Sequence, residues 1–337
     1  MQYGGYFYQN YYLRKSIKIL FNWFLGPVIF IFLSWSLYKQ ITHQADLPER
    51  WEQIKSSFET PALWFACVLV LLNWGLEARK WQLLLQPLQP LSFYNCFKSV
   101  LAGCSITMLT PNRVGEYGGR ILFVKEENRL DAIPLTILGS VSQLFITLFM
   151  GTAGLIYLKY FSTDQQLFNS LPVYAENILL YISSSATVFF MLIYFRVSLL
   201  VKVLNNIKFL KKATSHILLL NTFSRKQLLR ILFLSFLRYM VFILQFVLLL
   251  QIMQVQISFF TCFRLLTIFY LIMAIAPTIG FTELPIRAAA ILEILQPYSN
   301  NLLGMQAASL GIWIINLVIP AIVGSLLILG IKILKDK

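Results

Sequence analysis

The chain has 337 residues, of which 58% are hydrophobic and 12% are charged, and its mean hydropathy is +0.70. These values exclude a soluble domain and predict an all-α, polytopic integral membrane protein whose whole length, 1–337, forms a single membrane domain. The formal net charge is +14, but most basic residues flank apolar runs, which indicates membrane orientation and contact with anionic lipid rather than nucleic-acid binding.

Taken in chain order, the first half contains three predicted membrane spans and one interrupted apolar segment. A basic cluster precedes the first span and an acid-balanced segment follows it. The charged residues Glu77, Arg79 and Lys80 are expected to close the second span. The three spans lie at 19–38, 61–78 and 133–158, and the interrupted segment covers 94–130.

The interrupted segment reads Thr-Pro-Asn-Arg-Val-Gly-Glu-Tyr-Gly-Gly-Arg in its middle. Pro111 and Gly115 are expected to break the helix there, because proline removes a backbone donor and glycine favours non-helical angles. The break carries Arg113, Glu116 and Arg120. Broken backbone and charge at membrane depth are tolerated only where protein or a water-filled cavity surrounds them, so a polar site is expected here.

The second half repeats this plan. Pro277, Gly280, Glu283 and Arg287 follow in the same order, and Glu283 lies 167 residues after Glu116. In both copies the arginine comes four residues after the glutamate, which is ion-pair distance on a helix. The predicted spans of this half lie at 177–195, 231–252 and 303–333, and its interrupted segment covers 258–296.

Loop charge predicts the topology. The segment 196–230 has eight cations and no acid, so it should be cytoplasmic, as should both termini and the connection 79–98. The acid-balanced connections, expected outside, are 39–60 and 159–176. These assignments agree only if each interrupted segment is a re-entrant broken-helix hairpin, the first entering from the cytoplasm and the second from outside. Each half, 1–168 and 169–337, then has about three transmembrane helices plus one hairpin, forming two inverted repeats in the plasma (inner) membrane.

The paired motifs are candidates for a substrate site. In inverted-repeat transporters the interrupted segments meet near the midplane, where the carboxylates Glu116 and Glu283 need a partner or a cavity. Arg113, Arg120 and Arg287 could bind the phosphate of an anionic lipid headgroup, because guanidinium groups match phosphate geometry with paired hydrogen bonds. The alternative is that the acids only cap half-helices and neutralise the arginines.

Other polar residues in the predicted spans receive structural interpretations. Arg238 is close enough to the cytoplasmic face for its side chain to snorkel to water. The amide side chains in the spans are expected to join helices rather than bind ligand. These amides are Asn73, Gln143, Gln245 and Asn316.

Enzyme motifs give little support for catalysis. The two histidines, His43 and His216, fall in opposite predicted loops, and no His, Cys, Asp or Glu cluster has metal-ligand spacing. Zinc-protease, nucleophile-elbow and nucleotide phosphate-loop motifs do not occur in the sequence. We therefore expect no enzyme, no catalytic residue, no metal and no cofactor, although two carboxylates could still divide acid and base roles in a lipid-modifying enzyme.

The pattern Pro-x-Arg-x-Gly-Glu-x3-Arg at 111–120 resembles the lysylphosphatidylglycerol synthase transmembrane-region family of flippase-like membrane proteins. The pattern from Pro277 to Glu283, the Arg79-x-Trp81 pair and the basic middle loop look similar too, and the resemblance covers about 15–335. In two-part members of that family, the membrane region moves an aminoacylated phospholipid, and a C-terminal domain makes that lipid from aminoacyl-tRNA. The synthase part is expected to be absent here, so lipid aminoacylation is not carried over.

Together, the residues and the resemblance predict a flippase-like protein that translocates an anionic or glycosylated lipid across the inner membrane. Movement would be downhill, or coupled to ions or protons through Glu116 or Glu283. The alternatives are an intramembrane lipid-modifying enzyme and a non-transporting partner of an envelope-synthesis complex. The expected partners are membrane lipids, with no nucleic acid; the sequence leaves the cargo, the direction, the energy source and the oligomeric state open.

Overall fold

The computed structural model describes residues 35, 47–57, 59–107, 115–161, 173–196, 216–276 and 283–335. These ranges contain helices and loops and no strand, which confirms the all-α prediction for the described part of the chain. The α-helices are α3 (Leu47–Ser57), α4 (Pro61–Leu85), α5 (Phe93–Thr107), α6 (Gly115–Ile121), α7 (Arg129–Tyr160), α9 (Val173–Phe195), α12 (Arg225–Ile252), α13 (Phe259–Ile275), α14 (Glu283–Leu295), α15 (Leu302–Trp313) and α16 (Ile319–Lys335). The short 3₁₀ helices are η3 (Glu126–Asn128) and η5 (Leu218–Thr222), and a π-helix, η7 (Ile314–Val318), joins α15 to α16.

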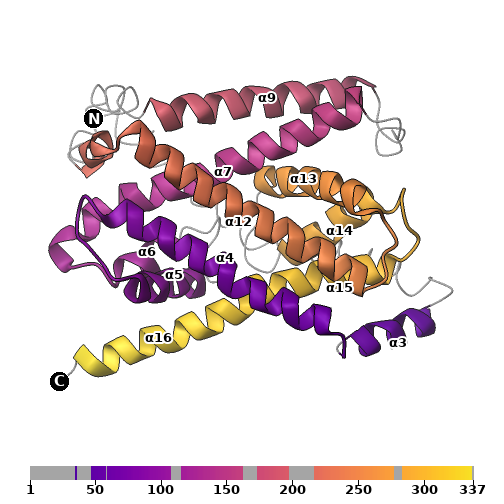
Figure 1. Cartoon of the computed structure of the whole chain (residues 1–337), viewed down its shortest axis with the longest axis horizontal. Helices are drawn as coiled ribbons and strands as arrows, with labels where there is room; N and C mark the ends of the chain where they lie inside the picture. The colour runs from indigo at the N-terminus through magenta and orange to yellow at the C-terminus, as the bar shows by residue number, and fades with distance from the viewer. Residues whose placement is uncertain are drawn as a thin grey trace, which may run out of the picture.

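Helices long and apolar enough to cross a membrane support the polytopic prediction. Within the described ranges there are five of them: Pro61–Leu85, Glu126–Tyr160, Glu176–Phe195, Arg225–Ile252 and Leu302–Ile328. In Figure 1, α4 and α12 cross the middle of the molecule, α9 lies along its upper edge and α16 along its lower edge. The span predicted at 19–38 lies outside the described residues apart from residue 35.

The second span is longer than predicted. The helix does not end at 78 but continues to Leu85, and Glu77 and Lys80 are buried inside it. These two charges do not close the span at a water interface, because both have ion-pair partners inside the protein. The connection before this span was predicted only as an acid-balanced segment, and it contains the helix α3.

Both interrupted segments contain helices on either side of the predicted break. In the first segment, α5 and α6 pack side by side so closely that a Cβ atom on Gly119 would lie 2.4 Å from the carbonyl oxygen of Ala102. Ser99 Oγ on α5 also donates a hydrogen bond to the Arg120 carbonyl on α6, at 2.8 Å. In the second segment, α13 packs against α14. The residues between the paired helices, including Pro111, Arg113, Pro277 and Gly280, lie outside the described residues.

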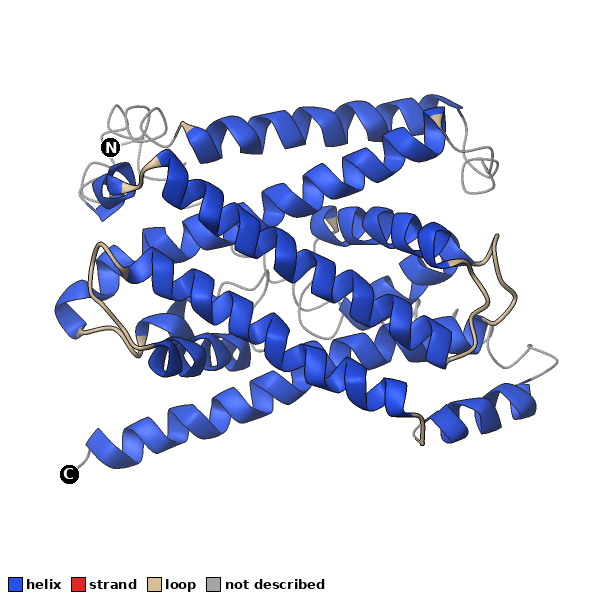
Figure 2. Cartoon of the chain, in the orientation of Figure 1, coloured by secondary structure: helices blue, strands red, loops and turns tan. Residues whose placement is uncertain are grey.

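The loops that flank each interrupted segment are joined to each other. Gln89 Oε1 accepts hydrogen bonds from the Lys125 backbone (3.2 Å) and the Asn128 side chain (3.1 Å), which ties the loop before α5 to the loop after α6. Asn301 Nδ2 donates to the Met253 carbonyl at 2.8 Å, which ties the loop after α14 to the loop before α13. Figure 2 shows the first pair of loops at the left end of the molecule and the second pair at the right end.

Each half packs one long helix against the interrupted segment of the other half. α16 crosses α5 so closely that a Cβ atom on Gly324 would lie 1.9 Å from the Leu101 carbonyl oxygen. α7 crosses α13 in the same way, where a Cβ atom on Gly154 would lie 2.1 Å from Thr267 Oγ1. The two halves are therefore interlocked around the central pair, α4 and α12, which also pack together.

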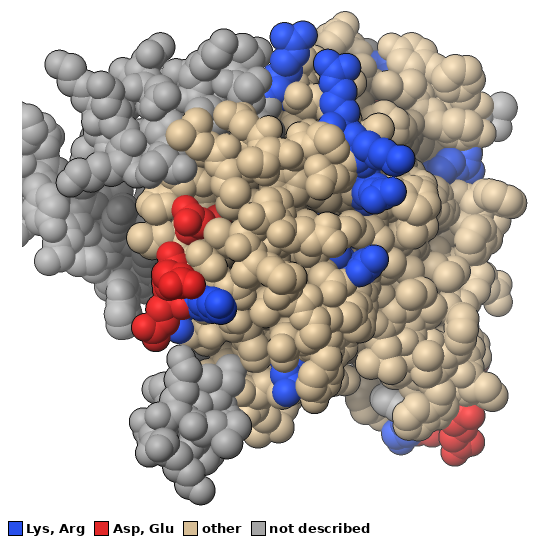
Figure 3. Space-filling view, turned by 60° about the vertical axis from the view of Figure 1, so that its left-hand side comes forward, with Lys and Arg blue, Asp and Glu red and all other residues tan. Residues whose placement is uncertain are grey.

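The outer surface suits a lipid environment. Large apolar side chains are exposed along α4 and α9, among them Trp64, Leu71, Tyr181 and Phe189. Figure 3 shows one face on which most of the surface is uncharged, with basic side chains concentrated in its upper part and acidic ones mainly near its left edge. Apolar side chains on the outside of a span-length helix face hydrocarbon without the cost they have in water.

Candidate functional site

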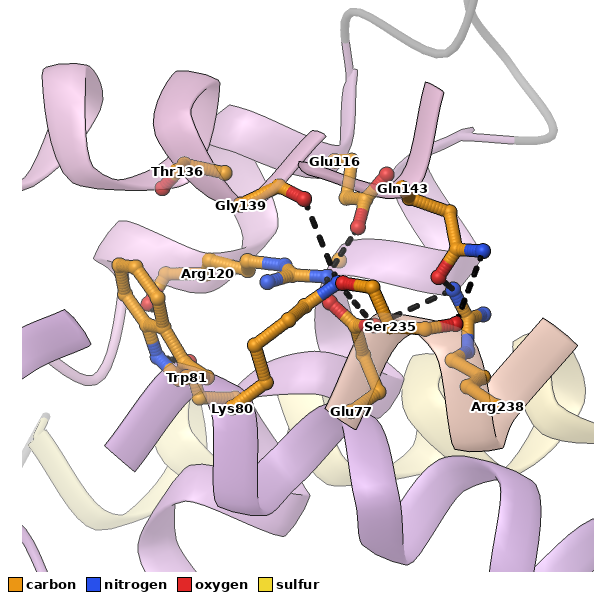
Figure 4. A network of polar contacts seen from close by, with 12 residues as sticks. Glu77, Lys80, Trp81, Glu116, Arg120, Thr136, Gly139, Gln143, Ser235 and Arg238 are labelled. Carbon is orange, nitrogen blue, oxygen red and sulfur yellow. Dashed lines mark hydrogen bonds and ion pairs between the residues drawn. The ribbon is translucent and has the colours of Figure 1, made fainter. Parts of the chain in front are cut away.

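Glu77 on α4 is the centre of a buried charge cluster. Its Oε1 lies 2.7 Å from Arg120 Nη2 on α6, and its Oε2 lies 2.8 Å from Lys80 Nζ and 3.1 Å from Arg238 Nη1 on α12. The side chain of Glu77 is 3% exposed. One carboxylate thus forms ion pairs with three cations that come from three helices (Figure 4). Because the cluster is buried, removal of one partner would leave a charge uncompensated inside the protein.

Two of these cations are almost fully buried. The side chains of Lys80 and Arg120 are 1% and 2% exposed. Lys80 Nζ also donates to the Gly139 carbonyl oxygen at 3.3 Å and to Ser235 Oγ at 3.4 Å. The Arg120 guanidinium lies over the Trp81 ring, at 5.5 Å from its centroid. Their partners are all inside the protein, which indicates that these two side chains hold helices together.

Glu116 is the most exposed carboxylate that contacts this cluster. It is the second residue of α6, and Arg120 Nη2 contacts it as well as Glu77, so the predicted Glu116–Arg120 ion pair is present. The side chain of Glu116 is 24% exposed, far more than that of Glu77. Gly115, predicted as part of the break, is the first residue of α6, where the chain resumes its helix.

Arg238 belongs to this cluster, and the prediction that its side chain snorkels to water was wrong. Nη1 pairs with Glu77, Nε donates to Asn73 Oδ1 at 2.9 Å, and the guanidinium lies 5.2 Å from the centroid of the Trp74 ring. The side chain is 13% exposed. A buried carboxylate 3.1 Å away stabilises the cation inside the protein, so extension to the membrane surface is unnecessary.

Amide side chains join the spans as predicted. Asn73 Nδ2 on α4 donates to Asn316 Oδ1 in the π-helix, at 2.6 Å. Gln245 Nε2 on α12 donates to the Ala66 carbonyl on α4 at 2.8 Å, and Gln143 Nε2 on α7 donates to the Ser235 carbonyl at 3.4 Å. Asn73 has a second role that the sequence did not reveal, because it also positions Arg238.

The second motif also forms an ion pair. Glu283 is the first residue of α14, and its Oε1 lies 3.9 Å from Nε of Arg287, one turn later. Both side chains are largely buried, at 11% and 9% exposure, and the Arg287 guanidinium lies 5.4 Å from the centroid of the Phe269 ring. The spacing of four residues between glutamate and arginine thus produces an ion pair in α14, as it does in α6.

One cavity of about 670 Å³ connects the two motifs. Its charged lining comes from both halves of the chain, and aromatic and aliphatic side chains such as Phe242 and Ile137 line the rest. The charged residues in the lining are Glu77, Lys80, Glu116, Arg238, Glu283 and Arg287. Of the predicted substrate-binding residues, Glu116, Glu283 and Arg287 therefore lie around one space, Arg120 supports that space from behind, and Arg113 is outside the described residues.

Sequence reasoning missed Glu77 and Lys80 as site residues. The sequence predicts both at a membrane interface, because charges commonly end a span. The sequence contains a signal that both are buried, because Glu77 and Lys80 share the helical spacing of the apolar residues Trp74, Ala78 and Trp81. These three residues are buried in the structure. Charges that fall on the apolar face of a span need partners, and a search for unpaired opposite charges in other spans would have pointed to Arg238.

The sequence predicts no metal site formed by His, Cys, Asp or Glu side chains. In the part of the chain that the structure describes, these residues form no group of three or more that could hold a metal ion. His216 Nδ1 instead lies 2.5 Å from Asp131 Oδ1, and His43 is outside the described residues.

Comparison with protein families identifies a match for this chain. The model of a family described as "Lysylphosphatidylglycerol synthase TM region" matches residues 23–282, which is more than half of the chain. No curated protein and no solved structure matches. The matched range includes α4, α6 and α12, the helices that carry the charge cluster, and ends just before α14.

Proposed function

The chain belongs to the lysylphosphatidylglycerol synthase transmembrane-region family, and from that premise we propose that it is a flippase-like protein that moves an anionic or glycosylated lipid across the inner membrane. The observation that carries this proposal is the cavity lined by Glu116 from one half and by Glu283 from the other. A polar headgroup would cross through this cavity while its acyl chains remain in the bilayer. A cavity with charged and apolar walls suits such a ligand.

The proposal includes the inverted-repeat topology. The hydrogen bonds of Gln89 and Asn301 support it, because each joins the two ends of one interrupted segment. A segment whose two ends are joined in this way enters and leaves at one end of the protein, and the two pairs of loops lie at opposite ends (Figure 2). Two hairpins entering from opposite faces would bring α6 and α14 to one site near the midplane.

Movement of the headgroup requires groups that can exchange partners. Glu116 is suited to this role because it is the more exposed of the two carboxylates that contact Arg120. When Glu116 is neutral or bound elsewhere, Arg120 keeps its contact with Glu77 at 2.7 Å. Glu116 can therefore change its partner while Arg120 keeps one carboxylate contact.

The test is lipid scrambling by purified protein in liposomes that contain a dye-labelled lipid. Glu116→Gln and Glu283→Gln should each abolish scrambling while the protein keeps its thermal stability. Glu293→Gln is the matched control, because Glu293 lies on α14 with Glu283 but is exposed. Normal scrambling in both variants would overturn the proposal.

The same liposomes separate the other two functions. A change in lipid mass without scrambling would favour the intramembrane lipid-modifying enzyme. Neither scrambling nor a change in mass would favour the non-transporting partner of an envelope-synthesis complex. A stability loss in Glu116→Gln that Glu116→Gln/Arg120→Gln restores would show that this ion pair is structural.

A further inference from the structure

The last membrane span changes its helix type in the middle, at the π-helix η7. The Ile319 amide donates to the Ile314 carbonyl, five residues earlier, rather than to the carbonyl four residues earlier as in an α-helix. Pro320 follows directly, and because proline has no amide hydrogen it cannot form an α-helical bond to the Asn316 carbonyl. A short π-helix inside a longer helix is a point where the helix can bend, and such segments are frequent at functional sites.

The two helices that this π-helix joins pack against different parts of the protein. On one side, α16 packs tightly on α5, where a Cβ atom on Gly324 would lie 1.9 Å from the Leu101 carbonyl oxygen. On the other side, α15 packs against α14, which begins at Glu283. The π-helix therefore lies between a helix fixed on the first interrupted segment and a helix that packs on the second.

The contact between α15 and α12 is tight at one end and looser at the other. Near the start of α15, a Cβ atom on Gly304 would lie 2.6 Å from the carbonyl oxygen of Met253, the residue that ends α12, and Asn301 Nδ2 donates to that carbonyl at 2.8 Å. Near the end of α15, a Cβ atom on Gly311 would lie 3.6 Å from Leu249 Cδ1, which is an ordinary van der Waals distance. Thus α15 is held where it begins and has room to tilt where it meets the π-helix.

Three buried donors on α15 lack partners in its present position. Among the described residues, Gln306 Nε2, Ser309 Oγ and Trp313 Nε1 have no hydrogen-bond partner. The three residues are spaced by three and four positions, so they share one face of the helix. Buried polar groups are almost always hydrogen-bonded, and those that are not call for an explanation. A helix with two positions provides one, because donors that are unpaired in the first position can be paired in the second.

We propose that the π-helix is a hinge about which α15 tilts together with α14, with the start of α15 at Asn301 as the fixed point and α16 remaining on α5. Because Glu283 lines the cavity, this movement would change the cavity. The hinge also contacts the charge cluster, since Asn73 donates to Asn316 Oδ1 at 2.6 Å and accepts from Arg238 Nε at 2.9 Å. The hinge itself is independent of the proposed function, but its use in lipid movement rests on that function.

Bending at the hinge can be measured without a transport assay. In a cysteine-free background, spin labels are attached at the exposed positions Leu310 on α15 and Val323 on α16, and pulsed electron paramagnetic resonance in liposomes records their distance distribution. The matched control pair, Ile178 and Met191, is also exposed and has the same separation (178 to 191 against 310 to 323) on the uninterrupted helix α9. Both separations correspond to about 20 Å of α-helix, and the pair across the hinge should give a distribution at least about twice as wide as the control pair.

Pro320→Ala should remove the hinge. Alanine supplies the amide hydrogen that proline lacks, so the α-helical bond to the Asn316 carbonyl can form. The distribution across the hinge should narrow to that of the control pair, and scrambling should fall at least about tenfold without a loss of thermal stability. Pro134→Ala is the matched control, because it removes a proline from within α7, where there is no π-helix, and it should change neither measurement.

The outcomes separate the hinge from the proposed function. A wild-type distribution as narrow as that of the control pair would overturn the inference, as would a wide distribution that Pro320→Ala leaves unchanged. Narrowing in Pro320→Ala with unchanged scrambling would overturn the role of the hinge in lipid movement. Absence of scrambling in wild-type protein would reject the proposed function only, because the distances still decide whether the hinge exists.

Discussion

Replacement of Glu77 by glutamine tests whether one carboxylate holds the helices α4, α6 and α12 together. Glutamine keeps the shape of the side chain and removes the charge that three cations share at 2.7 to 3.1 Å. In the wild-type cluster, the three cations Lys80, Arg120 and Arg238 outnumber Glu77 and Glu116 by one, so the formal charge is +1. In Glu77→Gln this rises to +2.

The expected cost is large because the cluster is buried. Removing one partner of a buried ion pair destabilises a protein by about 3–5 kcal/mol, which lowers the ratio of folded to unfolded protein by roughly two to three and a half orders of magnitude. Glu77 has three such partners, so the upper part of this range is expected. The loss should appear as low expression and as a lower midpoint of thermal unfolding in detergent.

A second variant shows whether charge is the cause. Lys80→Met in the Glu77→Gln background removes a cation whose side chain is 1% exposed and returns the cluster to +1. The double variant should therefore be more stable than Glu77→Gln alone, and the two single variants complete a double-mutant cycle. A Glu77→Gln protein as stable as wild type, or a double variant no more stable than the single one, would refute the reasoning.

Two further predictions concern packing and topology. Gly119→Ala should reduce the yield of folded protein, because its Cβ atom would lie 2.4 Å from the Ala102 carbonyl oxygen. Gly118→Ala should leave the yield unchanged, because its Cβ atom meets nothing within 4 Å. Similar yields from the two variants would argue against the tight contact between α5 and α6. In a cysteine-free background, single cysteines at the exposed positions 86 and 125 should be labelled from the cytoplasm, and those at 256 and 296 from outside. Labelling of either pair from opposite sides would exclude the re-entrant hairpins.

The sequence was most informative where a rule of helix geometry applied. Hydropathy predicted span-length helices, and the spacing of four residues predicted both ion pairs, Glu116 with Arg120 and Glu283 with Arg287. Such contacts are local, because residues four apart share one face of a helix. The amide pair of Asn73 and Asn316 followed from a general rule about polar groups in spans, although the rule did not specify the partners.

The charge cluster could not be predicted in full, because its geometry depends on how distant helices pack. Glu77 and Arg238 are 161 positions apart, and no periodic pattern specifies that α4 lies against α12 at the level of these two residues. Each charge alone was compatible with a position near a membrane surface. Only the three-dimensional arrangement shows that Arg238 forms an ion pair with Glu77 and faces the cavity.

The crossed packing of the two halves constrains how this protein can move. α16 meets the backbone of α5 at Gly324, and α7 meets α13 at Gly154, with no room for even one additional carbon atom at either contact. Rocking of one half against the other as rigid bodies would have to separate both contacts at once. The shorter helix α14 carries the carboxylate of Glu283 and takes part in neither of these two contacts, whereas α6, which carries Glu116, packs just as closely against α5 at Gly119. For the proposed lipid movement, the architecture therefore favours a cycle in which this frame stays still and local displacement of α14 opens the cavity first to one leaflet and then to the other.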